Sequence, residues 1–426
     1  MTQELAVEVL KDPSQGFTGI PPQRQAPRTP AQDEPRDLKL KLYSSDNELW
    51  IHAIVPDQAS ETGSWHQAPL EVSPEELLDR AARLRALWRD QIVHHQSTAL
   101  GPGRRVGGYP LAETADLSEL RAVTEPLVAK LAAEGHDLLY VLLDGTGYNL
   151  GRFREVLLDA LSSDRPLRIS IDSPWHLPWP MLAVDPADCA DPWEAFWGYR
   201  HQVEQASPDY PWDQAPLGHR ELATTSLNKD TALDHVGRAQ DVHELLDQRS
   251  RLIVRTHSED LLDALSCSVL HEDVMYFWCH GHYVHSGPSN QCLAIRLSDS
   301  ENIDGPVVRR TRRRYDHRTP QARFKPFVLL NACHTAQAAP PGRLKHLGQE
   351  LIALGAAGVL APQIEIPQVF ATEYAYAFLD HYLTGKYTAG EVSQLLVRQF
   401  AQDFHNPLAL TYSLHAGMNS RLDLAS

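Results

Sequence analysis

Three things are scarce in this sequence: cysteine, long apolar runs and positive charge. Five cysteines in 426 residues are few and odd in number, which argues against a disulfide framework and predicts a reducing, cytoplasmic setting. The longest apolar runs, such as LLYVLL at 138–143, fall far short of the ~20 residues that cross a bilayer, so we expect no membrane span. The N-terminus lacks the basic flank and apolar stretch of a secretory signal, and we expect no export. The net charge of −16 repels nucleic acid, which is therefore a poor candidate partner.

The first third of the chain reads as a tail followed by short strands and two helices. Residues 1–37 are rich in Pro, Gln and Thr and predict a disordered tail. Alternating apolar positions predict strands at 38–43 and 49–55. Ser73 with Glu76 predicts the start of a helix that runs to about residue 95. A second helix is predicted from Asp116 until Gly135 ends it.

From residue 138 onward, apolar segments and amphipathic segments alternate. Apolar runs predict strands at 138–144, 167–172, 252–256, 274–279, 292–297, 327–332 and 358–363. Helical spacing predicts helices at 153–161, 259–267 and 344–354. Strands that are apolar on both faces and separated by helices indicate an α/β fold, with a mainly parallel central sheet covered by helices on both sides. In such sheets the ligand site lies beyond the carboxyl ends of the strands.

Two of the predicted strands end in residues that could form a catalytic dyad. VMYFWC runs into His280, and FVLLNA runs into Cys333. A thiolate that attacks an amide needs a base for its proton and donors for the developing oxyanion. We interpret Cys333 as the nucleophile and His280 as the base, with the backbone amides of Gly281 and Cys333 as the oxyanion donors. Because Gly281 permits a turn, we expect the chain to bend away after His280 and to leave His282 in a loop.

These two strand ends resemble those of the CHAT family of caspase-like cysteine peptidases. YFWCHGH is similar to the family's strand ending in His-Gly, and VLLNACHTA is similar to its strand ending in Ala-Cys. Segments 168–184, 347–385 and 390–417 resemble the flanking elements, so the likeness spans roughly 100–426. It implies a caspase-like three-layer sandwich and a regulated cysteine endopeptidase that acts through a thioester. It also implies a bacterial defence or cell-death system with a separate activator or sensor protein, a protein substrate and no cofactor.

The resemblance also suggests a domain organisation. Residues 38–100 would form an N-terminal extension, and 101–250 the N-terminal part of the CHAT region, with a pseudo-caspase subdomain as one option. Residues 251–426 would form the catalytic subdomain. Family members often carry Ser at the position of Asn331 and an acidic or amide residue at that of His334, and this sequence has neither. The tetratricopeptide repeats often fused to such domains are also absent from residues 1–100.

Two other functions compete with peptidase activity. Cys279, His280, His282 and His285, with Cys333 and His334, could form a zinc site. Alternation along a strand argues against it, because Cys279 and His280 should point to opposite faces. The second alternative is a catalytically inactive caspase-like scaffold that serves as an interaction module.

Carboxylates at the strand ends are the candidates for substrate recognition. Related peptidases often bind a basic side chain, for which Glu365 and, less favourably, Asp144 are placed. A solvated acid or a helix cap is the simpler reading of each. The arginine-rich stretch from Arg309 to Arg323 lies between the two catalytic strands. It could be a solvated loop, a site of self-cleavage within 305–325, or a docking site for an acidic partner.

Overall fold

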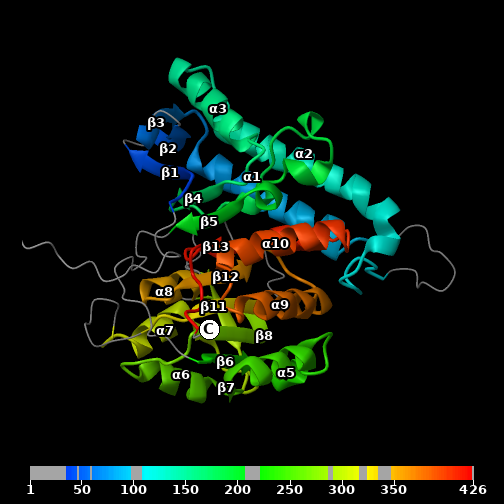
Figure 1. Ribbon diagram of the computed structural model, residues 1–426, viewed down its shortest axis with the longest axis vertical. Helices are drawn as coiled ribbons and strands as arrows, with labels where there is room; N and C mark the ends of the chain where they lie inside the picture. The colour runs from blue at the N-terminus through cyan, green and yellow to red at the C-terminus, as the bar shows by residue number, and fades with distance from the viewer. Residues whose placement is uncertain are drawn as a thin grey trace, which may run out of the picture.

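The named strands of the protein belong to one mixed sheet that runs the length of the molecule (Figure 1). The computed structural model describes residues 35–45, 48–57, 60–96, 108–206, 221–285, 291–315, 324–333 and 347–424. The strand order is β10-β9-β8-β11-β12-β13-β5-β4-β1-β2-β3, and β6 pairs with β8 and β7. Most neighbouring pairs are parallel, and helices cover both faces, as the sequence predicts.

One half of the sheet is built from the N-terminal strands and lies at the top of Figure 1. Its strands are β1 (Leu38–Ser45), β2 (Glu48–Asp57), β3 (Ser60–Leu70), β4 (Arg168–Asp172) and β5 (Gln202–Ala206). Its helices are α1 (Pro74–Trp88), α2 (Arg121–Leu143), α3 (Tyr148–Leu161) and α4 (Trp197–Arg200), and one π-helical turn, Arg89–Val93, follows α1. The Ser73 side chain accepts a hydrogen bond from the Glu76 amide, which confirms the predicted start of α1.

The other half carries the two predicted catalytic strands. Its strands are β6 (Ala223–Lys229), β7 (Ser250–Arg255), β8 (Val274–His285), β9 (Gln291–Arg296), β10 (Ile303–Asp304), β11 (Phe327–Cys333), β12 (Gly358–Pro362) and β13 (Tyr412–His415). Its helices are α5 (Ala239–Arg249), α6 (Ser258–Ser266), α7 (Gly305–Thr311), α8 (Leu347–Ala353), α9 (Gln368–Tyr382) and α10 (Ala389–Gln402).

The lower part of the sheet separates two apolar cores. Along β8, Val274, Tyr276 and Trp278 pack into the larger core, which includes α5 and α9. Phe277 and Cys279 point the other way into a smaller core with α6, α7 and α8. This alternation is what a strand buried on both faces requires. Figure 1 shows the two groups of helices on opposite sides of the strands.

Strand β13 joins the two halves of the sheet. It pairs antiparallel with β12 and parallel with β5, so this four-residue strand lies between the strands of the lower half and the N-terminal strands. The halves are therefore continuous through backbone hydrogen bonds as well as through packing.

The run LLYVLL at 138–143 is helical and Asp144 follows it as the helix cap, so the predicted strand at 138–144 is wrong. The run forms the last turns of α2, which does not end at Gly135. A β-carbon at Gly135 would lie 2.4 Å from the carbonyl oxygen of Met181, so the glycine allows close approach of another segment and does not stop the helix. A short apolar run buried in a helix cannot be told from a buried strand by periodicity.

Strands β3, β5 and β6 were not predicted from the sequence. Strand β6, ATTSLNK, is polar in composition yet buried along its whole length. It pairs in parallel with both β7 and β8, so the part of the sheet around β8 begins at residue 223. The domain boundary that we place at 250 remains a prediction, but α5 and β6 precede it.

The predicted tail is only partly within the described residues, because 1–34 lie outside them. Arg36 forms an ion pair of 2.7 Å with Glu204 of β5, and the Asp37 carboxylate accepts the Arg168 amide of β4. These two residues contact the sheet. In the part of the chain that is described, no helix is both long and apolar enough to cross a bilayer.

Candidate active site

Strands β8 and β11 bring His280 and Cys333 to neighbouring positions. The two strands are parallel, and their register pairs Cys333 directly with His280. Adjacent strands lie about 4.8 Å apart, so paired positions at a common sheet edge are close enough for a nucleophile and its base. The backbone therefore brings these two residues together at the carboxyl edge of the sheet, as predicted.

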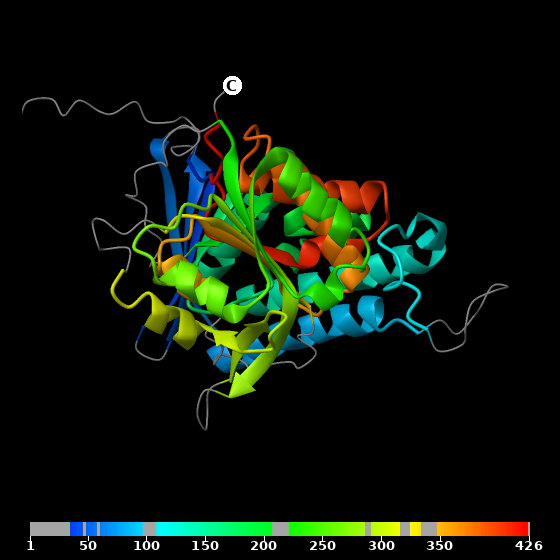
Figure 2. The ribbon, with the colours of Figure 1, turned by 90° about the horizontal axis from the view of Figure 1, so that it is seen from below.

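His280 lies where β8 changes its neighbour. Up to Trp278, β8 pairs in parallel with β6, whose last paired residue is Lys229. From His280 onward, the same side of β8 pairs antiparallel with β9. Figure 2 shows the yellow-green hairpin of β8 and β9 extending past the other strands. The chain that leaves β6 therefore turns beside His280, which is where an open α/β sheet places a binding site.

The turn after β6 contains Asp230, whose carboxylate lies beside His280. The Asp230 carboxylate oxygen Oδ2 lies 3.4 Å from His280 Nε2, and the side chains of Asp230 and His280 are 15% and 33% exposed. The pair is thus partly shielded and still open to solvent. Asp230 could not be identified from the sequence, because a single Asp fifty residues before the histidine has no motif around it.

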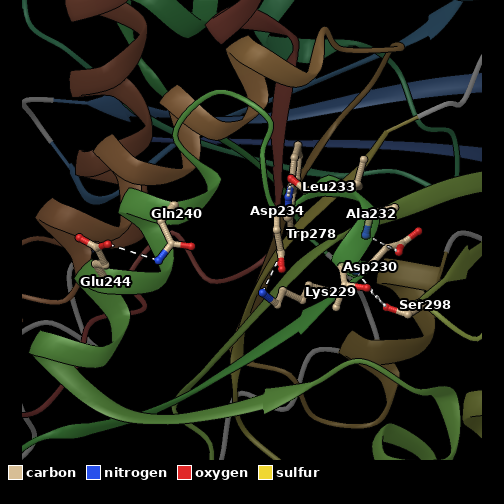
Figure 3. Close-up of polar contacts among 10 residues, drawn as sticks. Lys229, Asp230, Ala232, Leu233, Asp234, Gln240, Glu244, Trp278 and Ser298 are labelled. Atoms are coloured by element: carbon tan, nitrogen blue, oxygen red, sulfur yellow. Dashed lines mark hydrogen bonds and ion pairs between the residues drawn. The ribbon is translucent and has the colours of Figure 1, made fainter.

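The turn is fixed by several hydrogen bonds, which Figure 3 shows. The Asp230 amide donates to the Trp278 carbonyl, 2.9 Å away, and Asp230 Oδ1 accepts from the Ala232 amide at 3.0 Å. The Thr231 amide donates to Ser298 Oγ, and the Trp278 indole donates to the Leu233 carbonyl. Because both oxygens of Asp230 have defined neighbours, the carboxylate has little freedom to rotate away from His280.

A second ion pair closes the same turn. Lys229 Nζ lies 2.7 Å from Asp234 Oδ1, and the Lys229 side chain is only 9% exposed. This pairing supplies Lys229 with a carboxylate other than that of Asp230. Lys229 therefore does not neutralise Asp230, whose carboxylate lies beside the imidazole of His280.

The contact with Asp230 predicts which nitrogen of His280 can act as a base. A carboxylate beside Nε2 favours the tautomer in which Nε2 carries the hydrogen and donates it. The lone pair is then on Nδ1. The carboxylate also stabilises the imidazolium that forms when the ring takes up a second proton.

Gly281 is needed for close packing of two strands and not for the turn that we predicted. Strand β8 continues through Gly281 and His282 to His285, so the expected turn after His280 is wrong. A β-carbon at Gly281 would lie 2.8 Å from the Ala332 β-carbon and 3.3 Å from the Ala332 carbonyl oxygen. The glycine lets β8 and β11 approach each other at the dyad.

His282 therefore lies on the same strand as His280, and the two differ in their surroundings. Burial, with the nearby charge of Arg296, lowers the pKa of His282. Its position pairs with Ala294 of β9, whereas His280 is the residue in register with Cys333. The register and the carboxylate of Asp230 distinguish His280 as the base candidate.

Asn331, which departs from the family pattern, has a structural role. It is 1% exposed, its Nδ2 donates to the Ala371 carbonyl of α9 at 2.8 Å, and its Oδ1 accepts from the Tyr412 hydroxyl at 2.7 Å. These bonds tie the end of β11 to α9 and β13. The amide thus holds the strand two residues before Cys333.

The residues of the alternative zinc site are not all on one side of the sheet. Cys279 is buried in the smaller core, while His280 lies beside Asp230. The described part of the chain contains no group of three or more His, Cys, Asp or Glu side chains arranged to hold a metal ion. His334 lies outside the described residues.

The two candidate pocket acids lie in different places. Asp144 ends α2, and its carboxylate accepts the Gly145 amide. We predicted it as a pocket residue because residues 138–144 were expected to form a strand, and 138–143 are helical. Glu365 lies just past β12, at the same sheet edge as the dyad, with Oε2 3.7 Å from His94 Nε2. Whether either one binds substrate stays a prediction.

Comparison with known proteins gives one curated relative and several solved structures. No protein-family profile matches the chain. A probable protease of Vitiosangium sp. (strain GDMCC 1.1324) is 26% identical over 232 residues, which are 51% of this chain and 28% of that protein. Two crystal structures of the Saccharomyces cerevisiae separase–securin complex cover 91% of this chain and about 30% of the matched chain. Their TM-scores are 0.46 and 0.45, with 10% and 9% identity. The chain thus spans less than a third of each of these proteins.

Proposed function

We propose that this protein is a cysteine endopeptidase of caspase-like type. Cys333 is the nucleophile, His280 is the general base and Asp230 orients the base. The observation that carries the proposal is the register of β8 and β11, which pairs Cys333 with His280 beside the Asp230 carboxylate. The probable protease among the relatives supports peptide hydrolysis as the reaction.

The chemistry follows from these positions. The Cys333 thiol gives its proton to Nδ1 of His280, and the thiolate attacks the carbonyl carbon of the scissile peptide bond. Backbone amides of Gly281 and Cys333 are the proposed donors to the oxyanion. The imidazolium returns the proton to the leaving amine as the carbon–nitrogen bond breaks, which leaves a thioester on Cys333. Water, deprotonated by His280, then hydrolyses the thioester and restores the thiol. No step in this sequence requires a cofactor.

The experiment that tests the proposal compares three variants of the full chain. Cys333→Ala is expected to abolish cleavage. His280→Ala is expected to lose at least ~100-fold, the lower range for a positioned base. His282→Ala, on the same strand, serves as the matched control and should retain most activity. The readout is mapping of new protein N-termini after expression together with the neighbouring encoded proteins.

A thiol-labelling measurement separates the peptidase from the inactive scaffold. An activated peptidyl electrophile should label Cys333 rapidly in the wild type and slowly in His280→Ala, since a base raises the fraction of thiolate. The exposed Cys267 provides an internal reference for ordinary thiol reactivity. Equal labelling of Cys333 in both proteins would favour the scaffold.

The biological setting belongs to the same proposal. The family resemblance suggests a peptidase controlled by a separate activator or sensor protein in a bacterial defence or cell-death response. Glu365, at the same sheet edge as the dyad, is the first candidate for the carboxylate that binds a basic residue of the substrate, and Asp144 at the end of α2 is the second. Self-cleavage within 305–325 also stays a prediction, and 316–323 lie outside the described residues.

A further inference from the structure

Helix α7 and the turn that follows it carry an arginine cluster, which we define as Arg310, Arg313 and Arg314. All three side chains are exposed, and none forms an ion pair or side-chain hydrogen bond within the described chain. The Arg313 amide donates to the Arg310 carbonyl at 3.3 Å, so the turn folds back and holds these residues together. Three like charges in one turn repel each other when no counter-charge is present.

The neighbouring arginines of the same run are already engaged. Arg312 is fully buried, with Nη1 donating to the carbonyls of Leu265 and Cys267 at the end of α6 and its guanidinium over the Phe324 ring. Arg309 pairs with the buried carboxylate of Glu350 in α8. These two contacts fix the segment against α6 and α8, so the cluster is displayed from an anchored backbone.

The cluster differs from other arginines of the described chain in gathering three exposed, unpaired guanidinium groups in one turn of an acidic protein. Acidic residues exceed Lys and Arg by sixteen (55 against 39). Other exposed arginines, such as Arg83, Arg121 and Arg165, pair with a carboxylate of the chain. Unpaired guanidinium groups that are gathered on an anchored turn form a surface for an external anion.

We propose that the arginine cluster binds an acidic segment of a partner protein. Guanidinium groups bind carboxylates through two parallel hydrogen bonds, which suits separate Glu and Asp side chains. Nucleic acid fits less well, because α6, which packs on α7, exposes Glu259, Asp260 and Asp263, and the whole chain is strongly acidic. A continuous polyanion would meet those acids, whereas a peptide can place its carboxylates only on the cluster.

Binding is tested by fluorescence anisotropy with the full chain. The probe is a fluorescein-labelled peptide of alternating Glu and Ser, and the matched control peptide has Gln in place of Glu. The protein carries Cys333→Ala so that the probe is not cleaved, and the result therefore does not depend on the proposed peptidase activity. A labelled single-stranded DNA of similar length is the competing ligand.

The variants are matched for charge. Arg310→Gln/Arg313→Gln/Arg314→Gln removes the cluster. Its control removes three scattered, exposed arginines that also have no ion pair within the described chain, through Arg152→Gln/Arg251→Gln/Arg421→Gln. We expect the Glu peptide to bind the parent and the scattered variant, and to bind the cluster variant at least ~10-fold more weakly. The unfolding midpoint should be the same in all three proteins, and Arg313→Gln alone provides a milder variant if it is not.

Two results would overturn the proposal. One is that the Glu peptide fails to bind the parent protein, or binds the cluster variant as tightly as the scattered variant. The other is that DNA binds in a cluster-dependent way and the Glu peptide does not, which would assign the surface to nucleic acid.

Discussion

The close approach of β8 and β11 at the dyad makes Gly281→Ala an informative change. The new β-carbon would lie 2.8 Å from that of Ala332, whereas carbon atoms pack best at about 3.5 to 4 Å. The strands would have to separate by roughly 0.7 Å or more, and overpacking of this kind typically costs about 1 to 3 kcal/mol. Because a misplacement of ~1 Å near the chemistry can lower a rate by ~100-fold, activity should fall more than stability does.

The assay pairs urea unfolding with the rate of peptide cleavage or of Cys333 labelling. Adding Ala332→Gly removes the contact at 2.8 Å but leaves the carbonyl oxygen at 3.3 Å, so at least half of the lost stability should return. Gly151→Ala is the control, because nothing lies within 4 Å of its new β-carbon in the first turn of α3. That change should stabilise by about 0.5 to 1 kcal/mol. A fully stable and active Gly281→Ala protein, or a double variant with no recovery, would refute the reasoning.

Three further predictions concern charged and titrating groups. Asp230→Asn keeps an acceptor for the turn but removes the negative charge beside the imidazole, so kcat/KM should fall by at least ~10-fold, part of what a positioned base supplies. Arg309→Gln leaves the Glu350 carboxylate buried without its partner and should lower the urea-derived free energy of unfolding by about 1 to 2 kcal/mol, less than for a fully buried pair because Arg309 is 58% exposed. Arg310→Gln, the control, should change the free energy of unfolding by under ~0.5 kcal/mol. Equal destabilisation by the two variants would contradict the role of the Arg309–Glu350 pair. Burial lowers the pKa of His201 from its usual 6.5 to about 4. The neutral ring therefore contributes stability that is present above pH ~6.5 and is lost at ~1.4 kcal/mol per pH unit as the pH falls toward 4. His201→Gln should make unfolding stability less dependent on pH in that interval, and an unchanged slope would count against the assignment.

The strand segments VMYFWC and FVLLNA could be predicted because they are apolar throughout and run directly into His280 and Cys333. Both segments are buried on both faces, which is typical of strands in a largely parallel sheet that helices cover on both sides. Their common direction then places His280 and Cys333 at one edge. The register itself, which pairs the two residues, required the structure.

The parts that could not be predicted depend on polar groups satisfied at long range. Strand β6 looks like a loop in the sequence, yet its Asn228 donates to Ser226 Oγ and to the Tyr276 carbonyl within the sheet. Without β6 in place, nothing in the sequence marks Asp230 as a neighbour of His280. The run at 138–143 shows the opposite error, because its composition suits a buried helix as well as a buried strand.

The position of β13 has a consequence for biosynthesis. Residues 412–415 form the last of the described strands in sequence, and they complete the sheet between β12 and β5. While the chain is being synthesised, those two strands present open edges, which are surfaces prone to pairing with other chains. A sheet built in this way cannot be completed until residues 412–415 have been synthesised, and premature termination before residue 412 would leave two unjoined, aggregation-prone sheets.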